Sequence, residues 1–101
     1  MTFDEAETPS RFSIDDITGY SDGEIDRFIT MFHERFAKLN DLASTYSDRV
    51  TAYSHDESLS SQEKYTKVRL QSEFAELASE MRDDVKKKWF SCIIEQALRD
   101  L

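Results

Sequence analysis

Few side chains in this 101-residue sequence are of the types that do chemistry, and their spacing does not bring them together. Cys92 is the only cysteine, and His33 and His55 are the only histidines. Cys92 falls on an apolar helical stripe with no histidine nearby in sequence, which is typical of a buried, unreactive thiol. His33 is a full heptad or more from Asp26 and Asp41, too far for the three to share a metal ion. We therefore expect no catalytic nucleophile, no metal site and no cofactor.

The acidic side chains are numerous, but none forms a recognisable catalytic pair. Asp15 and Asp16 are adjacent in sequence, so on a helix their carboxylates point apart. Glu73, Glu76 and Glu80 follow one another at steps of three and four, as on a solvated helix face. The sequence has no Gly-rich phosphate loop, HExxH, GxSxG or CxxC motif. We expect that the protein is not an enzyme.

One run of three basic residues, Lys86–Lys88, could suggest a nucleic-acid contact. Successive residues of an α-helix are turned by about 100°, so these three lysines cannot form one basic face. The chain has 21 acidic and 13 basic residues and a net charge of −8, whereas phosphate binding needs clustered Lys and Arg. We expect no direct nucleic-acid binding.

The composition predicts an all-α fold. Two glycines and one proline are too few for the many turns of a β protein, while 39% hydrophobic and 12% aromatic residues can form a core. The longest apolar run, residues 92–94, cannot span a membrane, and the start of the chain is acidic where a signal peptide would be basic. A single cysteine fits a reducing compartment. We therefore expect a cytoplasmic protein with no membrane contact.

Two long helices follow from capping patterns and apolar spacing. Ser21 with Glu24 and Ser60 with Glu63 are capping-box patterns, which mark helix starts. They predict helices over 22–53 and 61–100, joined by a loop at 54–60. Because the loop is short, we expect a long antiparallel helical hairpin. The seam of the first helix, with steps of four and three, is Ile25, Ile29, Phe32, Phe36, Leu39, Ala43, Tyr46, Val50 and Tyr53.

The second helix has a less regular apolar pattern. Its predicted seam contains three consecutive steps of four, a stutter that shifts the stripe around the helix. Ahead of the hairpin, residues 13–20 predict a short helix, capped by Ser13 and ended by Gly19 in the left-handed conformation. Residues 1–12 are predicted to be a flexible acidic arm. The seam assigned to the second helix is Phe74, Leu77, Met81, Val85, Trp89 and Cys92.

The end of the second helix is apolar around an arc of roughly 240°, more than one neighbouring helix covers. Either the preceding N-terminal segment or a second copy of the chain could complete this packing. A second copy would make a homodimer, as a four-helix bundle. The predicted oligomer or N-terminal packing surface is Trp89, Phe90, Ile94, Leu98 and Leu101.

Two functions are compatible with these features. The first is a non-catalytic protein–protein interaction module, an adaptor or assembly factor, acting through its helical faces. The second is a small acidic inhibitor, of immunity-protein, antitoxin or phage anti-defence type, covering a basic site of a nucleic-acid-handling protein, since opposite charges speed association. The candidate partner-binding residues are Asp15, Asp16, Tyr20, Asp22 and Asp26 in the acidic front, and Tyr46 and Tyr53 near the hairpin tip.

The segment SIDDITGYSDGEIDRF, residues 13–28, resembles the start of the colicin DNase immunity proteins. That resemblance implies the inhibitor function. It covers less than a fifth of the chain, and the tyrosine-bearing loop of that family is missing, so it assigns no family.

Overall fold

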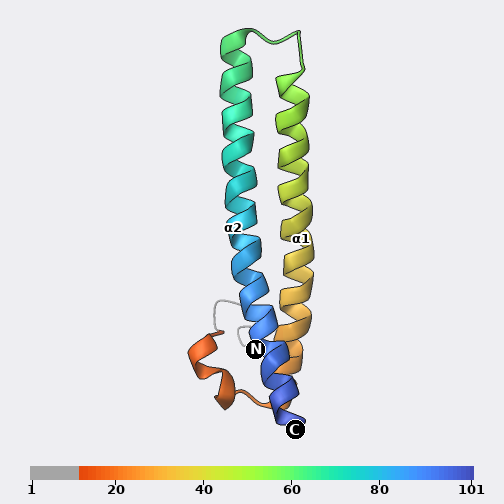
Figure 1. Cartoon of the computed structure of the whole chain (residues 1–101), viewed down its shortest axis with the longest axis vertical. Coiled ribbons are helices and arrows are strands. Elements are labelled where there is room, and N and C mark those ends of the chain that lie inside the picture. Colours follow the sequence, from red (N-terminus) through yellow and green to blue (C-terminus); the bar gives the residue numbers. More distant parts are fainter. Residues whose placement is uncertain (1–11) are drawn as a thin grey trace, which may run out of the picture. The chain divides into compact units, whose positions relative to one another are not determined.

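The computed structural model describes residues 12–101, and within that range it contains helices and loops and no strand (Figure 1). The elements are a 3-10 helix, η3 (Ile14–Gly19), and two long helices, α1 (Asp22–Ser54) and α2 (Ser61–Arg99). α1 and α2 pack against each other, which confirms the predicted all-α helical hairpin. The predicted acidic arm lies outside the described residues, except for Phe12.

The chain divides into two compact units, and each contains part of both long helices. We call residues 12–36 and 84–101 the terminal unit, and residues 37–83 the tip unit. In each unit the two helix segments run antiparallel, as the colours of Figure 1 show.

Both long helices begin at the predicted capping boxes. The Ser21 backbone N–H donates to the Glu24 carboxylate at 2.8 Å, and the Glu24 N–H donates to the Ser21 hydroxyl at 3.1 Å. Ser60 and Glu63 repeat the arrangement at 2.9 and 3.1 Å. Each box satisfies two backbone N–H groups that the first turn of a helix leaves without a partner.

The short helix lies within the predicted range as a 3-10 helix, but its predicted capping is wrong. The Ser13 side chain makes no capping bond, and its backbone N–H donates to the Tyr20 hydroxyl at 3.0 Å. Gly19 does not have a positive φ; the following residue, Tyr20, is extended, and its N–H bonds back to the Ile17 carbonyl at 3.4 Å. The chain therefore leaves η3 through extended backbone, which needs no left-handed residue.

The terminal unit has an aromatic core. Phe32 is fully buried, and the ring of Phe12 lies 4.9 Å from that of Phe28 and 5.1 Å from that of Phe32, both edge-on. Tyr20 packs 5.0 Å from Phe28. These contacts hold the segment around η3 against the first turns of α1. The buried hydrophobic side chains of this unit are Phe12, Ile25, Phe28, Phe32, Val85 and Cys92.

The tip unit has a thin core, and here the predicted seam of the second helix is wrong. Phe74, Leu77 and Met81 were assigned to the core but are 39%, 55% and 49% exposed. In the described part of this unit the buried hydrophobic residues are Leu39, Ala43 and Ala78. In the tip unit the buried and half-buried residues of α2, apart from Ser79, form an unbroken seam with steps of four and three. This inner seam is Lys64, Val68, Gln71, Ala75, Ala78 and Arg82, continued in the terminal unit by Val85, Trp89 and Cys92.

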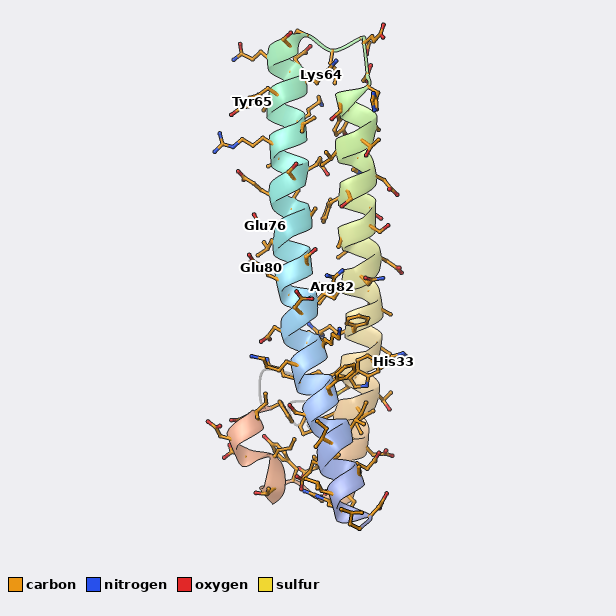
Figure 2. All side chains as sticks on the ribbon, viewed as in Figure 1. His33, Lys64, Tyr65, Glu76, Glu80 and Arg82 are labelled. Atoms are coloured by element: carbon orange, nitrogen blue, oxygen red, sulfur yellow. The ribbon has the colours of Figure 1, made fainter. Side chains whose placement is uncertain are left out.

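The reason for the error is that half of the tip-unit seam is polar. An apolar pattern alone selects the neighbouring positions Phe74, Leu77 and Met81, each one residue before a seam position. Arg82 reaches toward α1 (Figure 2), where its guanidinium donates to the Asn40 side-chain oxygen at 3.2 Å. The side-chain oxygen of Gln71 is buried without a hydrogen-bond partner.

Candidate interaction surfaces

The last turn of α2 is tied to the start of the chain through Arg99. Its guanidinium forms ion pairs of 2.8 Å with both Asp22 and Glu95, and donates to the Ile17 carbonyl at 3.2 Å. The bonds to Asp22 and then Glu95 raise the pKa of Arg99. Asp22, a predicted partner-binding residue, therefore also has an intramolecular role.

The other predicted residues of the acidic front lie in different surroundings. Asp15 and Asp16 are exposed in the first turn of η3. Asp26 accepts a hydrogen bond from the Gln96 side chain at 3.3 Å. Tyr20 is half-buried, with its ring in the aromatic core of the terminal unit. Asp15 and Asp16 are therefore open to solvent, whereas Tyr20 contributes to the core.

The two predicted tyrosines of the tip unit are half-buried. The ring of Tyr46 lies 5.4 Å from that of Phe74, and the Arg49 guanidinium is 5.8 Å from its centre. The Lys67 ammonium lies 5.3 Å from the centre of the Tyr53 ring. Each tyrosine thus pairs with a cation, a contact worth about 0.5–1 kcal/mol at exposed sites.

The end of α2 presents a large exposed apolar surface. Trp89 is half-buried and packs against His33 and Phe36, with ring centres 5.0 and 5.6 Å away. Residues 12–20 contact α1 through Phe12 and Tyr20 and the last turn of α2 through Arg99, and within residues 12–101 the other predicted residues of this surface stay exposed. We call the uncovered side chains the C-terminal apolar surface: Phe90 (45% exposed), Ile94 (59%), Leu98 (58%) and Leu101 (97%).

A second exposed apolar surface lies on α2 in the tip unit. Four large side chains with steps of four, three and four form it: Leu70, Phe74, Leu77 and Met81. We call them the outer seam. Sequence reasoning assigned three of them to the core and so missed this surface. The sequence did contain a signal for this surface, because Leu70 lies four residues before Phe74 and continues the regular spacing toward the start of α2.

The surroundings of Cys92, Lys86 and Lys88 indicate structural roles for these side chains. The side chain of Cys92 is fully buried, and burial raises the pKa of its thiol to about 11, which keeps it protonated. Lys88 forms a 3.0 Å ion pair with Asp84, whereas the Lys86 ammonium lies 5.6 Å from the centre of the Phe90 ring.

Two negative findings apply to residues 12–101. No three His, Cys, Asp or Glu side chains there come close enough together to hold a metal ion. None of the helices in that range combines the length and apolar character that crossing a membrane requires.

Comparison with known proteins assigns no function to this chain. No family model matches the chain, and neither the curated proteins nor the solved structures include a match. The resemblance of residues 13–28 to the immunity proteins therefore gains no support from these comparisons.

Proposed function

We propose that the chain is a non-catalytic protein–protein interaction module, whose C-terminal apolar surface receives an apolar helix face of a protein partner. The observation that carries this proposal is the exposure of Phe90, Ile94 and Leu98 along α2, and of Leu101 just beyond its end. Contiguous apolar patches on small proteins mark interaction sites, because leaving them in water is unfavourable.

The spacing of this surface suits a helical partner. Phe90, Ile94 and Leu98 recur every four residues, so their side chains form one ridge along α2. Ridges of this kind fit the grooves of another amphipathic helix. The Arg99 ion pairs fix the last turn of α2, so little conformational entropy is lost when a partner binds.

The charge of the neighbouring segment favours a partner with basic residues. Residues 1–30 contain eight acids and two bases. The Asp22 side chain is 90% exposed despite its ion pair with Arg99, so its second oxygen can meet a cation from outside. Complementary charge would mainly accelerate encounter, while apolar contact would hold the complex.

Site-specific photo-crosslinking in the source cells tests the proposal. A photoreactive residue at Ile94 is expected to capture a discrete protein. The same residue at Glu34, an exposed polar position of α1 on the side opposite the buried Phe32, is the control. The Phe90→Ser, Leu98→Ser double variant should lose the product while keeping its helical content. Equal labelling from both positions, or a product that survives the double variant, contradicts the proposal.

The second candidate function, a small acidic inhibitor of a basic site, is supported by the exposed carboxylates of Asp15 and Asp16. It predicts that the captured protein is lost when Asp15, Asp16, Asp22 and Asp26 are all changed to Asn, and that high salt also releases it. Apolar docking predicts that the product persists under both conditions, so the same crosslinking assay separates the two functions.

A further inference from the structure

The outer seam of α2 continues at both ends into charged residues with the same spacing. Steps of four and three run without interruption along this one continuous helix. All four apolar members are at least 39% exposed. In chain order the extended seam is Glu63, Lys67, Leu70, Phe74, Leu77, Met81, Asp84 and Lys88.

The residues of this extended seam complement those of a second, antiparallel copy of the same seam. If a second copy of α2 runs antiparallel, with the two-fold axis between Phe74 and Leu77, apolar residues meet apolar ones and charges meet their opposites. Phe74 faces Leu77, Leu70 faces Met81, Lys67 faces Asp84, and Glu63 faces Lys88, each pair occurring twice. A parallel pairing would instead place each of the four charged residues against its own copy, a repulsive arrangement.

We propose that two copies of this chain associate through the extended outer seam, with their α2 helices antiparallel. The inference goes beyond the proposed function, because it concerns a different surface and a different partner. Each outer-seam residue immediately precedes an inner-seam residue, so the two seams are about 100° apart around α2. That separation lets α2 contact α1 and a second α2 at once, as helices do in four-helix bundles.

The charged members already have local contacts, and these are compatible with pairing. Asp84 binds Lys88 at 3.0 Å, one Glu63 oxygen accepts the Ser60 N–H at 2.9 Å, and the Lys67 ammonium lies 5.3 Å from the centre of the Tyr53 ring. A carboxylate has two oxygens and an ammonium three donors, so each group can add an interchain partner.

One feature of the edge of this seam opposes association. Glu73 and Glu80 flank it one position before Phe74 and Met81, and in the antiparallel register Glu73 of one copy lies nearest Glu80 of the other. Glu80 points away from α1 (Figure 2), so it is not engaged there. Arg69 neutralises part of the Glu73 charge through a 3.1 Å ion pair. Glu80→Lys should therefore tighten the dimer.

Sedimentation equilibrium of the full chain, from micromolar to submillimolar concentration, tests the association. The wild type is expected to reach a dimer, and Leu77→Glu should weaken it by roughly thirtyfold or more, as at an interface hot spot. Leu98→Glu, on the C-terminal apolar surface, is the matched control and should leave the dimer intact. Circular dichroism confirms that each variant stays helical. A wild type that stays monomeric at every concentration, or equal weakening by both variants, overturns the proposal.

Charge reversal tests the direction of pairing. Lys67→Glu and Asp84→Lys should each weaken the dimer several-fold, and the double variant should recover it, because the reversed charges again meet their opposites. A parallel dimer would show neither the losses nor the recovery, so absence of recovery overturns the antiparallel register. The crosslinking at Ile94 does not depend on these positions, so this proposal and the proposed function can fail separately.

Discussion

The two units of this hairpin are built from the same two helices but bury very different side chains. The terminal unit encloses Phe12, Phe28 and Phe32, with Cys92 fully buried on α2. The tip unit encloses mainly Ala43, Ala78 and Leu39, and directs its larger apolar residues outward. Because burial of apolar area is the main stabilising term, we infer that most of the folding free energy resides in the terminal unit.

This difference shows that the two units divide their large apolar side chains between core and surface in different proportions. A large side chain at an inner-seam position stabilises the single chain. A large side chain one residue earlier stabilises the single chain less, since solvent still reaches it. Substitutions that remove similar side chains from the two units should therefore have unequal effects.

The largest effect is expected from Phe32→Ala. It removes a fully buried ring from the aromatic core and should lower the free energy of unfolding by about 3–5 kcal/mol. Phe74→Ala removes the same side chain from the tip unit, where it is 39% exposed, and should cost about 1 kcal/mol. Urea denaturation, followed by circular dichroism at low concentration, measures both. Equal losses would contradict the unequal distribution of core energy.

The next effect concerns the reactivity of Cys92. At pH 8 the buried thiol should react with iodoacetamide at least about a hundredfold more slowly in the folded chain than in denaturant, because it must open first. A Ser72→Cys, Cys92→Ala variant places the thiol on an exposed α2 position and should react at the unfolded rate. Rapid alkylation of native Cys92 would show that the terminal unit opens readily.

The same thiol gives the terminal unit a pH dependence. Its folded pKa of about 11 lies above the reference value of 9.0. The folded state therefore holds the proton more tightly, and the stabilisation is complete below pH 9 and is lost as the pH rises toward 11. In Cys92→Ala this contribution to the alkaline decline should be absent.

A smaller change of opposite sign is expected from Gln71→Leu in the tip unit. The buried Gln71 side-chain oxygen has no hydrogen-bond partner, so replacing the amide with an apolar group should raise the free energy of unfolding by about 1–2 kcal/mol. Gln62→Leu, at an exposed position of the same helix, is the control and should change little. A loss of stability in Gln71→Leu would mean that the polar seam is needed for the register of the helices.

The smallest effects are expected at the helix starts. Ser21→Ala and Ser60→Ala each remove a capping box and should cost about 1 kcal/mol, whereas Ser72→Ala, in mid-helix, should cost nothing. Amide exchange distinguishes the units: Ser60→Ala should speed exchange locally around the start of α2, while Ser21→Ala should affect the terminal unit. Identical exchange patterns in the two variants would contradict the division into units.

Much of the fold could be predicted from local sequence. The Ser21–Glu24 and Ser60–Glu63 patterns set both long-helix starts, because capping depends on side chains within one turn. The absence of Gly and Pro between residues 24 and 53 allows one long first helix. The burial of Cys92 followed from its place on an apolar stripe.

The rotation of α2 in the tip unit was decided only by tertiary packing. Leu77 is adjacent to Ala78, and Met81 is adjacent to Arg82. A rotation of α2 by about 100° about its axis would exchange which member of each pair faces α1 and which faces solvent. Apolarity alone favours the first member of each pair, but small residues let the helices approach, and Arg82 finds the Asn40 oxygen at 3.2 Å. Such contacts join residues that are distant in sequence, so the spacing of apolar residues does not predict them. Local patterns therefore determined where the helices lie along the chain, and contacts between helices decided which side of α2 the hairpin buries and which it leaves exposed.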